Sequence, residues 1–255
     1  MWLFKRRNKK YRNVIHGVTM ELDTTEGIQK TMSLGKYEPE QTSWVRQCIG
    51  KGDWFVDIGA NFGWYTTLGC QVVGDTGHVV AFEPSPTAFD ALVKVVADNQ
   101  VNNVTLERSA AGSENGEMTL YMPDNDALHS PSAFFSDPKF NKISVPRIML
   151  DDYKLLWKAP SIKLIKIDCE GYEPNVIEGM KRLIEAGRVE NMICEFNSGW
   201  LRRNNGTTPE DLQQLICSLG FERHQQTQRE SHPESSDGRM FSLQDIWFRH
   251  HQSRA

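Results

Sequence analysis

Residues 56–66 read VDIGANFGWYT and carry the clearest structural signal in the chain. They continue an apolar strand predicted over residues 54–58 and lead into a helix predicted over residues 64–73. Gly59 and Gly63 bracket the tight turn between them, where small residues let a ligand approach the backbone. The N-terminus of the helix offers unpaired N–H groups to a carboxylate, and Asp57 adds a negative charge that attracts an ammonium group. The loop therefore suits a ligand with both an amino and a carboxylate group better than a pyrophosphate.

An acidic residue follows at the next strand end. Glu83 comes 20 residues after Gly63 and closes a strand predicted over residues 78–82. Dinucleotide-binding folds place the acid that holds a ribose diol at this position. Such an acid is common to binders of NAD and of S-adenosylmethionine. The loop reads D-x-G-x-x-x-G rather than G-x-G-x-x-G, which favours the methyl donor and leaves an NAD-linked oxidoreductase as the alternative.

The same rhythm of strand, turn and helix extends along the chain. Further strands are predicted over residues 104–107, 162–167 and 192–196 and near residues 221 and 246–248. This alternation predicts an α/β, Rossmann-like fold with a mostly parallel seven-stranded sheet, helices on both faces and an antiparallel C-terminal hairpin strand. We expect a basic N-terminal arm and short strand over residues 1–30 and a single domain over residues 31–250. An insertion with a hairpin is expected at about 112–147, and acceptor-side loops are expected at about 198–207 and 225–241.

A second polar cluster, KIDCEGYEP, spans residues 166–174. Asp168 and Glu170 lie at the carboxyl end of the fourth strand, where open α/β sheets bind ligands, and Glu195 closes the fifth strand beside them. Carboxylates this close repel one another unless a positive charge is present. Lys166 is one source of that charge, although strand alternation leaves the direction of its side chain open. A divalent cation, Mg²⁺ or Mn²⁺, held by Asp168 and Glu195 is the other. Glu170 and Glu195 can alternatively accept backbone hydrogen bonds.

Composition excludes several classes of protein. The net charge of −4 argues against a general nucleic-acid binder, which needs excess Lys and Arg. No apolar run approaches the ~20 residues that span a bilayer. The basic N-terminus is expected to be a solvated tail, with weak contact to an anionic membrane surface as the alternative. The five cysteines occur singly, which predicts a reducing compartment, the cytoplasm.

Five motifs together resemble the FkbM-type methyltransferase family. They are GKYEPE (residues 35–40), FVDIGANFGWYT, AFEPSP, LIKIDCEGYEPNVIEG and ICEF, so the resemblance covers roughly residues 30–197. It implies a class I methyltransferase fold and an S-adenosylmethionine-dependent O-methyltransferase acting on hydroxyls of sugars, polyketides or related metabolites. Nucleic-acid base N-methyltransferases carry an Asp/Asn-Pro-Pro-aromatic turn where this chain has residues 168–171, DCEG, and are the disfavoured alternative.

The resemblance also implies a set of site residues. Asp168 would lie near the transferred methyl group. Because an aliphatic hydroxyl is a poor nucleophile, we separately expect Asp168 to act as base or metal ligand, with Glu170 and Glu195 as partners. His129, in the polar segment before the fourth strand, is the next candidate. The positions expected around the cofactor, besides Asp168, are Glu38, Asp57, Gly59, Ala60, Asn61, Gly63, Tyr65, Thr66, Glu83, Pro84, Ser109 and Ala110.

Overall fold

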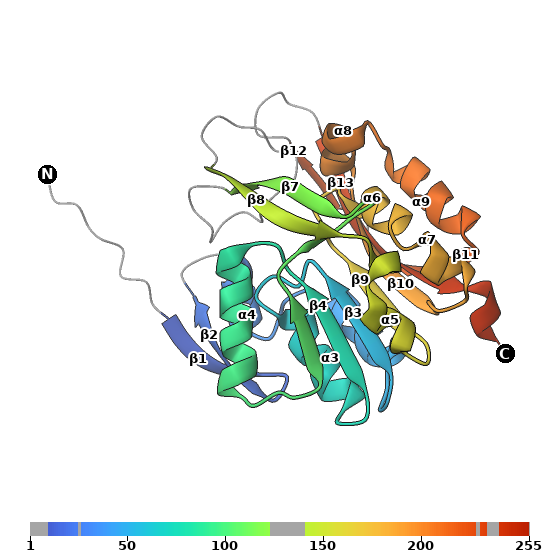
Figure 1. The fold of residues 1–255 in the computed structure, drawn as a ribbon. Coiled ribbons are helices and arrows are strands. Elements are labelled where there is room, and N and C mark those ends of the chain that lie inside the picture. Colours follow the sequence, from blue (N-terminus) through green and yellow to red (C-terminus); the bar gives the residue numbers. More distant parts are fainter. Residues whose placement is uncertain (1–9, 25–26, 123–140, 228–229, 234–239, 255) are drawn as a thin grey trace, which may run out of the picture.

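A twisted central sheet organises the chain (Figure 1). The computed structural model describes residues 10–24, 27–122, 141–227, 230–233 and 240–254. The sheet has the strand order β11-β13-β10-β9-β3-β4-β5, with β12 (Glu230–Pro233) paired to β13 beside this path. The strands are β3 (Trp54–Ile58), β4 (His78–Phe82), β5 (Val104–Glu107), β9 (Leu164–Ile167), β10 (Asn191–Asn197), β11 (Phe221–Gln226) and β13 (Met240–His250).

The pairing is parallel from β5 through β10 and antiparallel on both sides of β13. The predicted mostly parallel sheet with an antiparallel C-terminal strand is therefore confirmed. The antiparallel strand is not the outermost one, because β13 lies between β10 and β11. The parallel strands all have their carboxyl ends at the same edge of the sheet. The loops that follow β3, β4, β9 and β10 therefore meet there.

Helices cover both faces of the sheet and create two main cores. Alternate residues of β3 point to opposite sides: Phe55 packs with α2 (Pro39–Cys48) and α3 (Trp64–Val73), whereas Val56 packs with the other layer. That layer contains α6 (Glu173–Glu178), α7 (Lys181–Glu185) and α9 (Pro209–Ser218). Burial on both faces explains why the parallel strands are apolar almost throughout.

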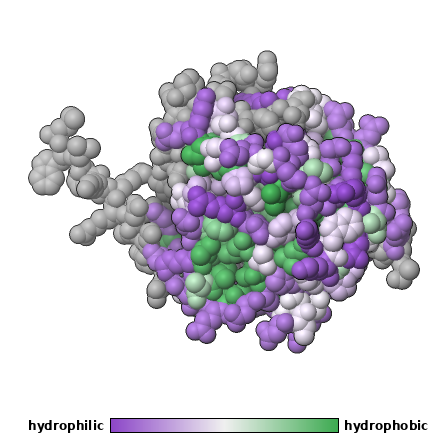
Figure 2. All heavy atoms as spheres, in the orientation of Figure 1, coloured by the Kyte–Doolittle hydropathy of each residue, from purple (hydrophilic) through white to green (hydrophobic). Residues whose placement is uncertain are grey.

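Helix α4 (Pro86–Asp98) begins as the sequence predicts, because the Ser85 hydroxyl accepts a hydrogen bond from Ala88 N and Pro86 follows it. Hydrophilic residues cover much of the face drawn in Figure 2, interrupted by a hydrophobic area over α4 and β5. Val93 on α4 is 40% exposed there. No helix within the described parts of the chain has the length and apolarity to cross a membrane.

Two small sheets flank the central one. At the N-terminus β1 (Lys10–Ile15) pairs with β2 (Val18–Asp23), so a two-stranded hairpin stands where one short strand was expected within residues 1–30. The insertion forms a second small sheet from β6 (Ala110–Ala111), β7 (Gly116–Met122) and β8 (Asn141–Ile148), in which β7 and β8 pair antiparallel. The basic residues 1–9 and residues 123–140, which include His129, lie outside the described residues.

Several elements differ from the prediction. The segment expected as a loop over residues 198–207 is mostly helix α8 (Ser198–Asn205), and the Asn197 side chain caps it by accepting hydrogen bonds from Gly199 N and Trp200 N. After β9 the chain forms two short helices, separated at Gly179, which packs against the backbone of Gly112. Helices α1 (Gly27–Ser33) and α5 (Lys154–Lys158) and the 3-10 turns η1 (Leu150–Asp152) and η2 (His251–Arg254) were not anticipated.

Candidate functional site

A cavity of about 290 Å³ lies at the carboxyl ends of the parallel strands. It brings together residues from β3, β4, β9 and β10, from α1 and α3, from the segment before α2, and from the insertion. Most of the predicted site residues line it, namely Glu38, Gly59, Ala60, Asn61, Tyr65, Glu83, Pro84, Ser109, Ala110, Asp168, Glu170 and Glu195.

The glycine loop is held against two neighbouring strands. Gly59 N and Ala60 N both donate to Phe82 O at 3.0 Å, and Asp168 N donates to Ile58 O at 3.0 Å. Gly59 has φ +81°, and a Cβ there would lie 1.8 Å from the carbonyl oxygen of Asp168. Glycine is required because the ends of β3 and β9 approach too closely for a side chain.

Glu83 is fixed at the end of β4 by backbone donors. Its two carboxylate oxygens accept hydrogen bonds from Asn61 N at 2.7 Å and from Ser85 N at 2.8 Å. The side chain is 5% exposed and lines the cavity. Burial raises the pKa of Glu83 to about 7, although the two backbone hydrogen bonds favour the charged form. A carboxylate has about four acceptor positions, so Glu83 can accept two further hydrogen bonds from a ligand diol.

Three residues predicted to surround the cofactor, Asp57, Gly63 and Thr66, are not part of the cavity lining. Asp57 is 1% exposed and accepts the Thr66 hydroxyl hydrogen bond at 2.6 Å, so it stabilises the first turn of α3. Burial raises the pKa of Asp57 to about 6. Gly63 precedes α3 with φ +89°, and its missing side chain makes room for Leu92 on α4.

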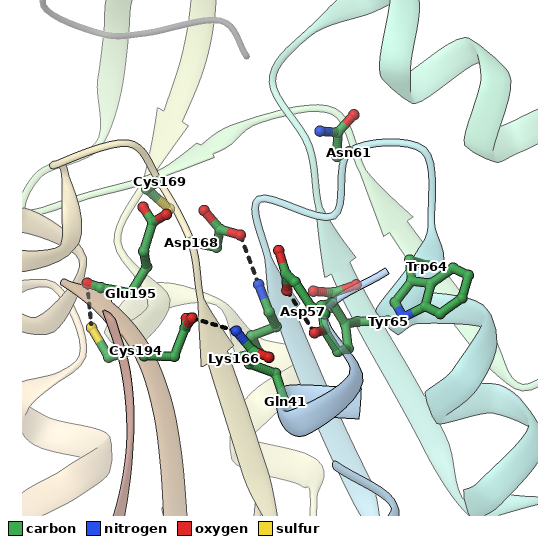
Figure 3. A network of polar contacts seen from close by, with 12 residues as sticks. Gln41, Asp57, Asn61, Trp64, Tyr65, Lys166, Asp168, Cys169, Cys194 and Glu195 are labelled. Atoms are coloured by element: carbon green, nitrogen blue, oxygen red, sulfur yellow. Dashed lines mark hydrogen bonds and ion pairs between the residues drawn. The ribbon is translucent and has the colours of Figure 1, made fainter. Parts of the chain in front are cut away.

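A buried lysine occupies the space among the carboxylates. Lys166 Nζ lies 2.8 Å from Asp168 Oδ2 and 4.5 Å from the centre of the Tyr65 ring. The Tyr65 hydroxyl donates to Glu38 Oε2 at 2.6 Å. Figure 3 shows Lys166 extending from its strand between Asp168 and Tyr65. Lys166 therefore points into the site. Of the two expected sources of positive charge, Lys166 and a divalent cation, the lysine is the one that the structure places beside the carboxylates.

Glu195 differs from Asp168 in its hydrogen bonding. Its Oε2 atom is buried and has no hydrogen-bond partner among the described residues. Burial, followed by the charges of Asp168, Glu170 and Glu173, raises the pKa of Glu195 well above its ordinary value. A carboxyl with an unused oxygen at the wall of a cavity can exchange a proton with a ligand hydroxyl.

Backbone strain concentrates around the same cavity. Among the described residues other than glycine, five have positive φ, and three of these line the cavity: Glu38 (φ 39°), Asn61 (φ 49°) and Glu170 (φ 52°). Left-handed conformations cost free energy for residues with a Cβ and are enriched at functional sites. The strain supports the assignment of this cavity as the functional site.

The predicted metal site does not fit this donor set. Among the described residues, no group of three or more His, Cys, Asp and Glu side chains is arranged to hold a metal ion. One oxygen of Asp168 already contacts the Lys166 ammonium group.

The structure also adds residues that sequence reasoning missed. Tyr37 on the segment before α2, Ile28 and Met32 on α1, and Met118 and Leu120 on β7 line the cavity. The GKYEPE motif pointed to Tyr37, but nothing pointed to an apolar wall from α1. Trp200, Arg202 and Arg203, in the segment expected as an acceptor-side loop, lie on α8 and are not part of the cavity lining.

Comparisons with known proteins found a matching family model and two relatives. A family model described as the Methyltransferase FkbM domain matches residues 57–223. The hexuronic acid methyltransferase AglP of Haloferax volcanii is 25% identical over 160 residues, which cover 63% of this chain and 59% of that protein. Methyltransferase 1 of Beauveria bassiana is 24% identical over 149 residues, covering 49% of this chain and 57% of that protein. The chain thus spans less than two thirds of the length of either relative.

Solved structures with a similar fold include two methyltransferase-type proteins of low identity. A putative rRNA-methylase from Clostridium thermocellum has a TM-score of 0.47 and 11% identity, with 82% of this chain and 94% of that chain covered. Aeropyrum pernix fibrillarin in complex with S-adenosyl-L-methionine has a TM-score of 0.44 and 10% identity, with 82% and 73% covered.

The family match begins at Asp57 and continues past Glu195, so it includes the glycine loop, Glu83 and the carboxylates of Asp168, Glu170 and Glu195. It covers more than half of the chain. Together with the strand order it establishes the Rossmann-like class I methyltransferase fold. This chain is a member of the FkbM methyltransferase family.

Proposed function

We propose that this protein transfers a methyl group from S-adenosylmethionine to a hydroxyl group of a sugar, a glycan or a related metabolite. The observation that carries the proposal is the geometry of Glu83. Its carboxylate lines the cavity at the end of β4, is oriented by two backbone N–H groups, and stands beside a glycine loop that a side chain would obstruct. This arrangement suits the ribose diol of an adenosine-type ligand.

The remaining lining residues suit the other parts of such a ligand. The Ser109 hydroxyl is buried without a hydrogen-bond partner among the described residues, so it is available to a nitrogen of a heterocycle. Backbone N–H groups at a helix N-terminus bind carboxylates, and Trp64 and Tyr65 in the first turn of α3 line the cavity. When bound, S-adenosylmethionine supplies an electrophilic methyl group on a positively charged sulfur.

The carboxylates at the ends of β9 and β10 would serve the acceptor. The acceptor oxygen forms a bond to the methyl carbon, the carbon–sulfur bond breaks, and its electron pair stays on sulfur. The hydroxyl proton passes to a carboxylate, for which Asp168, Glu170 and Glu195 are the candidates. Alignment of the reacting atoms in a cavity that excludes water can contribute ~7–11 kcal/mol to the rate.

The proposal of a sugar as the acceptor is supported by one of the relatives. AglP is named as a hexuronic acid methyltransferase, and it shares 25% identity with this chain. We extend its acceptor class, a sugar, to this protein. We place the reaction in the cytoplasm because all five cysteines are free thiols.

Ligand binding tests the donor. S-adenosylhomocysteine should raise the melting temperature of the protein, whereas NAD at the same concentration should not. Calorimetry should show that Glu83→Gln weakens the binding of S-adenosylhomocysteine at least tenfold. Glu117→Gln, a substitution at an exposed position of β7, should leave this affinity unchanged. Stabilisation by NAD alone would support the oxidoreductase instead.

Product analysis tests the reaction. We expect a glycoside panel incubated with the enzyme and S-adenosylmethionine to yield a product heavier by one methyl group. Retention of this group after mild base would identify a methyl ether. Its loss would identify a methyl ester on a carboxylate and contradict transfer to a hydroxyl.

A further inference from the structure

Glu38 occupies an unusual position at the wall of the cavity. It immediately precedes α2 with φ 39° and ψ 67°, and its side chain makes no capping hydrogen bond to that helix. Instead the carboxylate lies in the cavity lining, where the Tyr65 hydroxyl donates to its Oε2 at 2.6 Å. The left-handed backbone therefore directs the carboxylate away from the helix end and into the ligand space.

The cavity around Glu38 has more acidic than basic side chains in its lining. Lys166 is the only Lys or Arg side chain among the described lining residues, and its Nζ contacts Asp168. Its ammonium group also lies over the Tyr65 ring, whose hydroxyl donates to Glu38. The lining thus has five carboxyl groups, on Glu38, Glu83, Asp168, Glu170 and Glu195, and one ammonium group. A positively charged ligand group improves this balance.

Asp57, the acid that the sequence favoured for this role, is less suitable. It is 1% exposed, does not line the cavity and already accepts the Thr66 hydroxyl. One of its oxygens, Oδ1, has no hydrogen-bond partner among the described residues, so Asp57 remains the natural competitor in an experiment.

We propose that Glu38 binds the α-ammonium group of the donor's amino-acid moiety and that Tyr65 holds the Glu38 carboxylate in position for it. This inference rests on the proposed function, because it requires S-adenosylmethionine as donor. Glu38 is a binding residue in this scheme, and Tyr65 acts on the ligand through Glu38. Burial raises the pKa of the Glu38 carboxyl, while Lys166 and the Tyr65 hydroxyl favour its charged form. A bound ammonium group would favour that form further.

The test compares two ligands on the intact protein by calorimetry: S-adenosylhomocysteine and its desamino analogue, in which hydrogen replaces the α-amino group. The wild-type protein should bind S-adenosylhomocysteine at least tenfold more tightly than the analogue. Glu38→Gln should reduce this ratio to less than threefold while binding the analogue almost as the wild type does. Glu40→Gln, an exposed acid two residues along on α2, should keep the wild-type ratio.

Two further variants make the result decisive. Tyr65→Phe keeps the ring under Lys166 but removes the hydroxyl, and it should give a ratio between those of the wild type and Glu38→Gln. If Glu38→Gln does not fold, Tyr65→Phe takes its place in the comparison, and an unchanged ratio overturns the proposal. The proposal is also overturned if folded Glu38→Gln keeps the wild-type ratio, or if Asp57→Asn abolishes the ratio instead. Failure of the wild type to bind S-adenosylhomocysteine at all would overturn the proposed function itself.

Discussion

The contact between Gly59 and the Asp168 carbonyl predicts the effect of adding one carbon atom. In Gly59→Ala the new Cβ would lie 1.8 Å from that oxygen, far inside van der Waals contact, at a φ of +81°. The positive φ costs about 1–2 kcal/mol for a residue with a Cβ. Forcing an extra atom into a packed interior adds about 1–3 kcal/mol. We therefore expect a loss of about 2–5 kcal/mol in the free energy of unfolding.

A matched variant separates these two contributions. Gly206 has a similar φ of +67° with nothing within 4 Å of an added Cβ, so Gly206→Ala should show the conformational cost alone. Urea titration of both variants, followed by circular dichroism, measures the difference in the free energy of unfolding. Folded Gly59→Ala should also fail to bind S-adenosylhomocysteine, because separation of β3 and β9 displaces the loop. Equal destabilisation of the two variants would refute the claim that these strand ends are in close contact.

Three further outcomes are expected. Because burial raises the pKa values of Glu83 and Glu173 to about 7, the folded state binds more protons than the unfolded state between about pH 4.5 and 7. The ligand-free melting temperature should therefore fall as pH rises through this window, and a rise would contradict the burial of these acids. Asn197→Ala should cost about 1 kcal/mol in urea titrations by removing the α8 cap, and no loss would show that the cap is dispensable. Because Lys166 is the cation beside Asp168, chelators should leave the rate of methyl transfer unchanged. Loss of activity on chelation that Mg²⁺ reverses would instead support a metal ion at Asp168.

The sequence predicted those parts of the site whose geometry follows from a single strand and its turn. Gly59 and Glu83 each lie at the end of a parallel strand, and neighbouring parallel strands end at the same edge. The strand order alone therefore predicts that Gly59 and Glu83 lie close together. Asp57 lies on the same strand as the loop it precedes, but its side chain is turned into the protein behind that loop, where Thr66 is the partner. Sequence spacing places a residue at a strand end without showing which side of the sheet it faces.

The direction of Lys166 was undecided for a related reason. All four residues of β9 are buried, so the apolar pattern does not distinguish the side that carries the cavity. Helix α8 was missed because its sequence, SGWLRRNN, lacks an apolar stripe, and only the capping by Asn197 marks its start. The wall contributed by α1 comes from a separate element that packs against the cavity, a tertiary contact that no local pattern encodes.

The position of β13 has a consequence for how the chain is made. This strand pairs with β10 over seven residues and with β11 on its other side, and it is the last strand among the described residues. During synthesis from the N-terminus, β10 therefore remains an outer strand with unpaired backbone groups until residues 240–250 have emerged. Gln41 on α2 also lacks its hydrogen-bond partner, Asp245 at 2.6 Å, until that part of the chain has been made. Incomplete chains would thus expose an apolar strand edge that can pair with other nascent chains, and this stage is the one at which chaperones would matter most.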